Sequence, residues 1–275
     1  MEGAVLSSYP ARALAQKMSL VLTQRVAVGV MPVRALVGLG RHPYTDWTGK
    51  LQPKDEEAVW QAIVDVGIEP LANRSVCELS DGERQKVMIA RALAQHPQVM
   101  ILDEATAFLD LPRRVELMSL LRGLAHAQGR AVLLSTHDLD LALRSADRIW
   151  LLPPGGPLRQ GSPEDLVLCD AFRDAFSGSD VKFDKRSGAF RMETLRRGRI
   201  SIVGDDIPAM WTFRALERAG YQVVAPGAGA LCVEVRESRD GNRWWIHGAE
   251  NLECRSVEAV LNFLEASERT GPGFS

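Results

Sequence analysis

The stretch Leu79–Asp110 constrains the fold of this 275-residue chain more than any other part of it. In its first half, Ser80 and Glu83 stand at the spacing of a capping box, which predicts a helix that runs to about Ala94. The free N–H groups and the positive dipole end of such a helix suit a phosphate group. Gly82, in the first turn, would let an anion approach the backbone closely.

The second half of the stretch is the apolar run Val99–Leu102, followed at once by Asp103 and Glu104. A short apolar run of this kind indicates a buried parallel strand, and the carboxyl ends of such strands are where ligands of open α/β sheets bind. One carboxylate there can hold a magnesium ion, and the next can orient a water molecule. Each half alone is common in proteins, but the two halves at this spacing are not.

Together with two later motifs, this stretch closely resembles the nucleotide-binding subunits of ABC transporters. Leu79–Gln85 is similar to the signature motif of that family, Val99–Glu104 to its Walker B motif, and Leu109-Asp110 to its D-loop. His137, at the end of the next expected strand, matches the switch histidine of the family. A single histidine at a strand end is more often structural, but four motifs in this order argue strongly against chance.

The resemblance implies a role for each matching residue. In the head-to-tail dimer of the family, Asp103 binds Mg²⁺ through water, Glu104 polarises the attacking water, and His137 contacts the γ-phosphate of ATP. Gln24 closes the expected strand Met18–Thr23 and matches the Q-loop glutamine, which touches the metal and reports on the membrane partner. A glutamine in such a place is usually a polar loop residue. The residues that the resemblance assigns to nucleotide binding are Gln24, Ser80, Asp81, Gly82, Glu83 and Asp110.

The rest of this region predicts alternating strands and helices. Apolar runs at 99–102, 131–135 and 148–152 alternate with helical patterns, one of which begins at Pro112 and is ended by Gly129. Repeated β-α-β units favour a largely parallel sheet. With the resemblance, the expected fold class is α/β, a P-loop NTPase-like ABC ATPase core in residues 1–184, with a helical subdomain at about 31–78.

Within that subdomain, Val37–Tyr44 is similar to the same region of importers for iron-siderophore, haem or cobalamin complexes. The alternative is a polar loop over Gly40–Trp47, broken by Pro43 and anchored by an aromatic residue. The resemblance implies that the subdomain docks the membrane-spanning permease subunit.

Residues 185–275 predict a small α+β domain whose function the sequence does not assign. Strands are expected near 189–192, 199–203 and 221–224, a hairpin at 231–235 and 243–246, and helices at 208–219 and 256–267. Trp211, Trp244 and Trp245 could form a ligand platform, but aromatic residues of small α+β domains are more often core residues. We therefore expect these tryptophans in the core.

The sequence does not contain the phosphate-cradling loop G-x-x-x-x-G-K-S/T, because Gly49-Lys50 is followed by Leu51. The family places this loop further upstream of Gln24 than the 23 residues that precede it here. Without its N–H groups, its lysine and its hydroxyl ligand for Mg²⁺, independent ATP binding should be weak. We expect either that Met1 is an internal methionine of a longer protein or that this is a degenerate subunit.

Truncation is favoured because the downstream catalytic residues remain. Two further departures from the family pattern leave those residues in place. Asp81 replaces the first glycine of the signature pair, and Ala105 replaces the proline that usually follows Glu104.

Composition excludes several other classes of protein. With 33 basic and 35 acidic residues the formal net charge is −2, which does not favour a nucleic-acid binder. The four cysteines form no C-x-x-C pair, so no zinc site or disulfide framework is indicated and a reducing cytoplasm fits. No apolar run reaches the roughly 18 residues of a membrane span.

The sequence therefore predicts the ATPase subunit of an importer, with ATP and Mg²⁺ as cofactors. Its partners would be permease subunits and a second ATPase subunit, at the cytoplasmic face of the cell membrane. The alternative is a catalytically inactive partner or regulatory subunit that lends its signature helix to a complete one. A DNA-maintenance ATPase of the ABC class is less favoured, because no long heptad coiled coil separates the motifs.

Overall fold

The structure is a computed structural model, and internal contacts divide the chain into two units. It describes residues 3–22, 30–176, 181–185, 188–192, 197–227, 231–236, 241–248 and 251–270. The first unit comprises Met1–Ser177 and Phe183–Ala189, and the second comprises Gly178–Lys182 and Phe190–Ser275. Each unit is described by itself, and the domain boundary after residue 184 stays a prediction.

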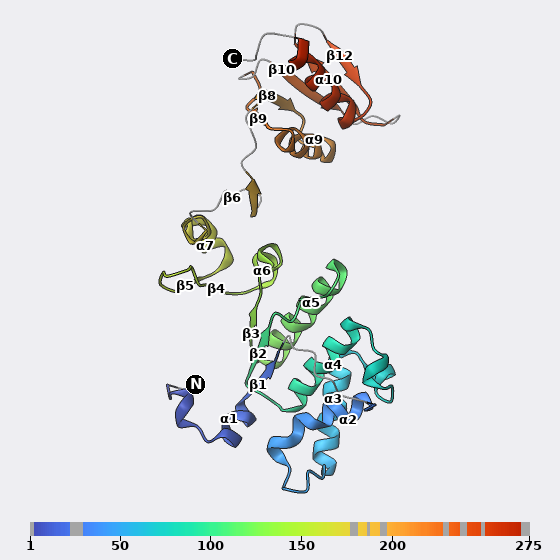
Figure 1. The fold of residues 1–275 in the computed structure, drawn as a ribbon, viewed down its shortest axis with the longest axis vertical. Helices are drawn as coiled ribbons and strands as arrows, with labels where there is room; N and C mark the ends of the chain where they lie inside the picture. The colour runs from blue at the N-terminus through green and yellow to red at the C-terminus, as the bar shows by residue number, and fades with distance from the viewer. Residues whose placement is uncertain are drawn as a thin grey trace. The chain divides into compact units, whose positions relative to one another are not determined.

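The first unit contains a parallel sheet with the strand order β1-β2-β3 (Figure 1). Its strands are β1 (Met18–Val21), β2 (Val99–Asp103) and β3 (Ala131–Ser135). The central strand β2 carries the buried side chains of Met100 and Leu102, as its apolar run predicts. Asp103 pairs with Ser135 in the register of β2 and β3, so the carboxyl ends of these two strands are level.

Helices α2, α3 and α4 pack against one another and form the helical part of this unit. The α-helices of the unit are α1 (Ala11–Lys17), α2 (Val33–Gly38), α3 (Pro53–Val66), α4 (Asp81–Ala94), α5 (Leu111–Gln128), α6 (Leu139–Ser145), α7 (Pro163–Leu168) and α8 (Ala171–Ala175). Short 3-10 helices are η1 (Leu6–Ser8), η2 (Leu39–Tyr44), η3 (Glu69–Leu71) and η4 (Val76–Glu78). The predicted helix after Ser80 is present, and α5 ends at Gly129, whose φ of 62° is a left-handed C-cap.

The stretch Gly40–Trp47, for which a polar loop was the alternative, begins instead as η2, and part of it is buried. Arg41 is 6% exposed, and its guanidinium group donates to Asp55 Oδ1 of α3 at 3.0 Å and to the carbonyl of Ala94 in α4 at 2.8 Å. A Cβ on Gly40 would lie 2.1 Å from the carbonyl oxygen of Arg91, so η2 and α4 meet closely here. The polar-loop alternative was wrong for residues 40–44, because a non-local ion pair organises this segment.

Two predictions about the sheet were also wrong. The strand at 131–135 was expected to be buried, but β3 alternates between exposed and partly exposed residues, and Leu133 is 38% exposed. In the described part of the chain β3 pairs with β2 alone, which leaves its other edge open. The strand expected at 148–152 is β4 (Ile149–Leu151), which does not join this sheet but pairs antiparallel with β5 (Arg159–Gly161).

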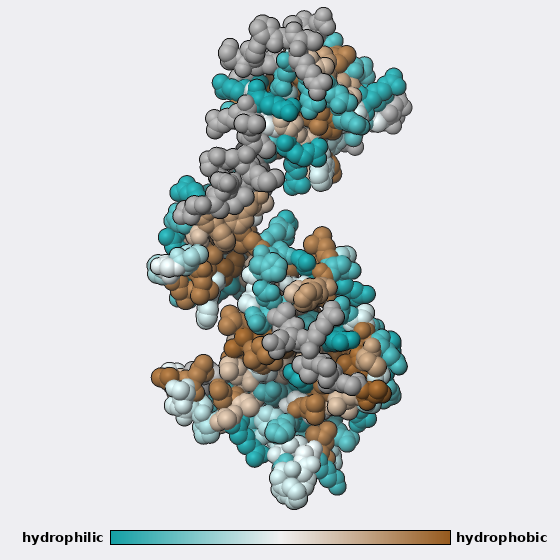
Figure 2. Space-filling view, in the orientation of Figure 1, coloured by the Kyte–Doolittle hydropathy of each residue, from teal (hydrophilic) through white to brown (hydrophobic). Residues whose placement is uncertain are grey.

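Figure 2 shows apolar side chains on the surface over β4, β5 and α7. The exposed apolar residues of this region include Trp150, Leu152, Leu158 and Leu168.

The second unit contains a five-stranded sheet with the order β12-β11-β10-β8-β9 and two helices. Its elements are β8 (Gly198–Val203), α9 (Ile207–Arg218), β9 (Tyr221–Val224), β10 (Leu231–Arg236), β11 (Arg243–His247), β12 (Leu252–Cys254) and α10 (Val257–Thr270). The strands β6 (Val181–Asp184) and β7 (Ala189–Met192) form a separate pair, and each contains residues of both units. Trp244 lies in the core, as predicted, and donates to Thr212 Oγ1 at 2.7 Å. Trp211 is 55% exposed, so the core prediction was wrong for that residue.

Candidate functional site

The two predicted acids lie at the carboxyl end of β2, and Ser135 of β3 fixes both of them. The Ser135 hydroxyl donates to Asp103 Oδ1 at 2.6 Å. The backbone N–H of Glu104 donates to Ser135, with distances of 2.9 Å to Oγ and 3.1 Å to the carbonyl oxygen. Sequence reasoning missed Ser135, because its role depends on the register of two strands about thirty residues apart.

Glu104 turns the chain out of the strand through an unusual backbone conformation. Its φ is 46°, in the left-handed region that costs a residue other than glycine about 1–2 kcal/mol. The Glu104 side chain is 47% exposed, and its Oε1 lies 3.5 Å from Nδ1 of His137. The structure therefore brings Asp103, Glu104 and His137 together at the carboxyl ends of β2 and β3, with the carboxylate of Glu104 facing the imidazole.

A magnesium ion fits the carboxyl end of β2 if phosphate oxygens and water supply most of its ligands. Among the described residues no group of three or more histidine, cysteine or acidic side chains could hold a metal ion. Protein sites for Mg²⁺ commonly supply one or two carboxylates, while phosphate oxygens and water complete the octahedron. Asp103 is the exposed carboxylate that suits this role. The second expected ligand, Gln24, lies outside the described residues.

The start of α4 forms the second group of predicted site residues. The backbone N–H of Glu83 donates to Ser80 Oγ at 3.3 Å, and the N–H of Ser80 donates to Glu83 Oε2 at 2.9 Å. This is the predicted capping box. The hydrogen bonds from the backbone and the hydroxyl of Ser80 lower the pKa of Glu83, and Arg74, 3.7 Å away, adds to this effect. The carboxylate of Glu83 is thus engaged by its own helix cap.

Gly82 and Asp81 complete this turn. A Cβ on Gly82 would lie 3.8 Å from Arg113 Cδ and 3.9 Å from Leu109 Cδ2, which are ordinary contact distances. Protein packing therefore does not require glycine here, and its predicted role toward an anion stays a prediction. Asp81 is exposed at the first position of the helix.

The D-loop segment, Leu109-Asp110, lies directly before α5. Asp110 accepts a hydrogen bond from the N–H of Arg113 at 3.0 Å and so caps α5. Arg114 donates to the carbonyl of Leu109 at 2.8 Å and to Asp138 Oδ2 at 3.2 Å. Asp138 in turn caps α6, so Arg114 ties the segment after β2 to the segment after β3. Sequence reasoning missed both Arg114 and Asp138, although Asp138 has the residue type of a helix cap.

Comparison with known proteins identifies the family. The family model described as "ABC transporter" matches residues 4–107. An uncharacterised ABC transporter ATP-binding protein of Methanocaldococcus jannaschii is 37% identical over 213 residues, which are 77% of this chain and 73% of that protein. The chain belongs to the family of ABC transporter ATP-binding proteins. The predicted resemblance and the predicted fold class are confirmed.

Further matches concern both parts of this ABC family member. The family model described as "Iron ABC transporter C-terminal domain" matches residues 197–265, in the part that sequence reasoning left unassigned. The ferric enterobactin transport ATP-binding protein of Escherichia coli is 34% identical over 170 residues, 62% of this chain and 63% of that protein. A solved ABC transporter described as of the metal-chelate type, in an inward-facing conformation, has a TM-score of 0.52 at 28% identity, over 55% of this chain and 59% of that one.

The chain thus spans less than two thirds of the length of several curated relatives that it matches. In the described residues no helix is long and apolar enough to cross a membrane.

Proposed function

We propose that this chain is the ATP-binding and ATP-hydrolysing subunit of an ABC importer for a metal-chelate ligand, such as an iron-siderophore, haem or cobalamin complex. The observation that carries the proposal is the arrangement of Asp103, Glu104 and His137 around Ser135 at the carboxyl ends of β2 and β3. The match of the second unit to an iron transporter domain and the ferric enterobactin relative support this ligand class.

Each residue of the site has a task in this proposal. Ser135 holds the Asp103 carboxylate by its Oδ1 and fixes how it faces a bound metal. Glu104 accepts a hydrogen bond from the attacking water and orients it, while His137 lies beside Glu104 and reaches the γ-phosphate. When bound, Mg²⁺ would neutralise charge on the phosphate oxygens. Gln24 would contribute to the metal site.

The start of α4 would serve the nucleotide held by the opposite subunit. Ser80 and the N–H groups of the first turn would donate to its phosphate, and the helix dipole favours the negative charge. Asp81, Glu83 and Asp110 would shape this contact rather than bind phosphate directly, since Glu83 and Asp110 are engaged as helix caps.

The helical part of the first unit would dock a membrane-spanning permease subunit at the cytoplasmic face of the membrane. The exposed large apolar side chains of this part include Leu39 at 52%, Trp47 at 96% and Trp60 at 47%. If a permease contact covers these side chains, they would lose their exposure to water on docking, which would favour the contact. The second ATPase subunit of the dimer would be another copy of this protein.

A second candidate function is an inactive partner that lends its signature helix to a complete subunit. The capping box that fixes Ser80 at the start of α4 would serve this role without a metal site in the same chain. In this case Ser80 and Gly82 would matter, whereas Glu104 would not.

One experiment separates the two candidates. ATP hydrolysis is measured for the product of the whole coding sequence, alone and mixed with a loop-bearing homologue, using the parent, Ser80→Arg and Glu104→Gln. If the chain is an ATPase subunit, both substitutions lower the rate of the mixture, and Glu104→Gln does so by about 10²–10⁴ at the site that this chain completes. If it only lends its helix, Ser80→Arg alone lowers the rate. A mixture that neither substitution changes would contradict both candidates.

The ligand class has its own test. Uptake of a ferric siderophore, haem and cobalamin is measured in cells that make the whole transport system, with and without this chain. Loss of none of the three on deletion would contradict the metal-chelate assignment.

A further inference from the structure

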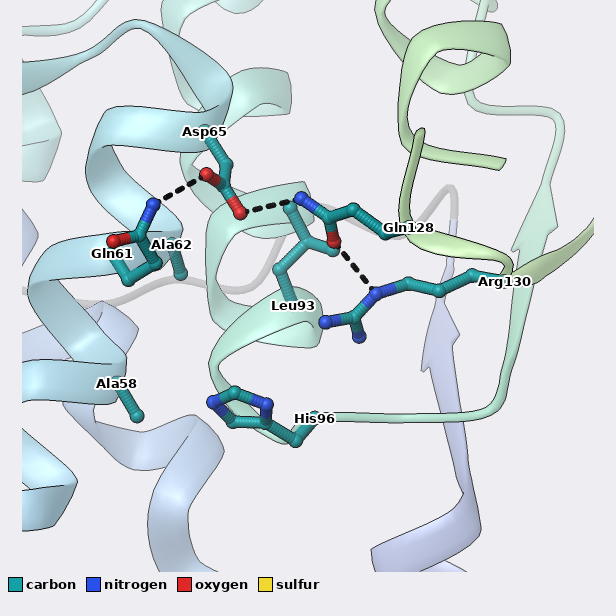
Figure 3. Close-up of a pocket in the computed structure, with 8 residues that line it drawn as sticks. All are labelled: Ala58, Gln61, Ala62, Asp65, Leu93, His96, Gln128 and Arg130. Carbon is teal, nitrogen blue, oxygen red and sulfur yellow. Dashed lines mark hydrogen bonds between the residues drawn. The ribbon is translucent and has the colours of Figure 1, made fainter. Parts of the chain in front are cut away.

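A pocket of about 240 Å³ lies between α3, the end of α4 and the segment that follows α5 (Figure 3). Its inner wall is apolar and consists of Ala58 and Ala62 of α3 and Leu93 of α4. Polar side chains of Gln61, Asp65, His96, Gln128 and Arg130 line the rest.

The pocket is separate from the candidate nucleotide site. His96 lies in the segment that leads into β2, and Arg130 directly precedes β3. Both residues are therefore at the amino ends of these strands, whereas Asp103 and Glu104 are at the carboxyl end of β2. The strand β2 has five residues, and each adds about 3.3 Å to its length. The two sites therefore lie at opposite ends of the strands.

Two neutral amides donate hydrogen bonds to the one acidic side chain that lines the pocket. Gln61 donates to Asp65 Oδ1 at 2.7 Å, and Gln128 donates to Asp65 Oδ2 at 2.8 Å, as Figure 3 shows. Arg130 does not contact this carboxylate. Its Nε donates to the Gln128 amide oxygen at 2.8 Å and its Nη1 to the carbonyl of Pro97 at 3.0 Å. Within the described part of the chain, Arg130 is thus a partly buried cation that forms no ion pair.

A partly buried cation of this kind favours an anion beside it. Burial lowers the pKa of Arg130, because the charged form loses hydration, and Asp65 opposes this from a distance. A guanidinium group presents its N–H donors in a planar fork that matches a carboxylate.

His96 supplies a second polar group at the same place. Its φ is 51°, a conformation unusual for a residue other than glycine, and its ring lines the pocket. Burial and the nearby charges of Arg41 and Arg130 lower the pKa of His96, so the ring is neutral near pH 7 and offers one N–H donor. Figure 3 shows His96 and Arg130 reaching into the pocket from the segments before β2 and β3.

We propose that this pocket binds a small organic carboxylate, with the anionic group on Arg130 and His96 and the carbon skeleton on Ala58, Ala62 and Leu93. The apolar wall favours an organic anion, and Asp65 disfavours the higher charge of inorganic phosphate. A bound carboxylate would connect α3 of the helical part with the start of β3. This is the end of the strands that lies away from the nucleotide site. The proposal does not depend on the proposed function.

The test uses the full chain with ¹⁵N-labelled backbone amides. Acetate and benzoate are titrated, with benzamide as the uncharged counterpart of benzoate and inorganic phosphate as a competing anion. We expect at least one carboxylate to shift the amides of His96 and Arg130 in a saturable manner, and benzamide to bind about tenfold more weakly than benzoate, or worse. Three results would overturn the proposal: no shift with any carboxylate, equal binding of benzamide and benzoate, or tighter binding of phosphate than of every carboxylate.

Two variants test whether the ligand binds in the proposed pocket, and a third variant is the control. Arg130→Met keeps an unbranched apolar stem but removes the charge, and should weaken binding about tenfold or more. Gln61→Glu replaces an exposed amide that donates to Asp65 with a second carboxylate at the rim, and should also weaken binding of an anion. Arg144→Met is the matched control, because Arg144 is 71% exposed on α6 and pairs with Asp140. If Arg130→Met and Gln61→Glu both bind within twofold of the parent, the assignment is wrong.

Discussion

The buried pair of Arg41 and Asp55 gives the sharpest test of how the helical part is held together. Their side chains are 7% and 2% exposed, and Arg41 Nη2 lies 2.9 Å from Asp55 Oδ1. Arg41 also donates to the carbonyl of Ala94 and stacks 3.8 Å from the centroid of the Tyr44 ring. One guanidinium group thus connects η2, α3 and α4.

Replacing Arg41 with methionine keeps much of the apolar volume but leaves the Asp55 carboxylate buried without its partner. Removing one member of a buried pair typically costs about 3–5 kcal/mol, because the other charge stays uncompensated. For a domain whose free energy of unfolding is about 5–15 kcal/mol, this is a large loss. Arg34→Met is the control, since the Arg34–Glu56 pair has half-exposed side chains and its loss should cost about 0–1 kcal/mol.

The double variant Arg41→Met/Asp55→Asn separates charge from packing. The amide oxygen of the introduced asparagine can still accept the hydrogen bond from the N–H of Gln52 that caps α3, but the side chain carries no charge. The double variant should therefore be about 1–3 kcal/mol more stable than Arg41→Met alone. Because the chain has two units, amide hydrogen exchange in α3 and α4 is measured beside urea unfolding. If Arg41→Met costs no more than Arg34→Met, the pair does not hold this part together.

Three further predictions concern other contacts. Gly40→Ala should lower the urea midpoint by the equivalent of about 1–3 kcal/mol, because its Cβ would overlap the carbonyl oxygen of Arg91; an unchanged midpoint would refute the close contact. In a preparation supplied with a phosphate loop, Glu104→Gln should retain nucleotide binding, whereas Asp103→Asn should weaken Mg²⁺-dependent binding; equal effects on nucleotide affinity would contradict the separate roles. Burial opposes the ionisation of Asp55, but hydrogen bonds from the Gln52 N–H and Arg41 prevail and lower its pKa. Its stabilising contribution is therefore present above the unfolded pKa of about 3.9 and lost as the pH falls through the folded value, so urea midpoints of the parent and Asp55→Asn should converge on acidification.

Local signals in the sequence predicted much of the fold. The capping box at Ser80 sets the start of α4, and Gly129 ends α5, because both act within one helical turn. Apolar runs predicted the strands that became β1, β2 and β3, and the hairpin predicted at 231–235 and 243–246 is confirmed by the antiparallel pairing of β10 with β11. The short strand β12 (Leu252–Cys254) carried too little pattern to be predicted.

Contacts between residues far apart in the chain could not be predicted in the same way. The bond from Ser135 to Asp103 depends on strand register, and the pair of Arg41 and Asp55 on how two helices meet. Neither leaves a periodic signal in the sequence. The edge position of β3 likewise could not be read from its apolar composition, which is typical of a strand buried on both faces.

The backbone at Glu104 supports a chemical rather than a structural reason for this residue. A φ of 46° favours glycine, so folding alone gives no advantage to a glutamate there, and the two hydrogen bonds from its N–H to Ser135 would form with any residue. Its side chain is half exposed and fills no core, so packing does not explain it either. Backbone strain at a polar, accessible residue is a feature of functional sites, where the surrounding structure sustains it. The strain is therefore best explained by the carboxylate that it presents at the sheet edge beside His137.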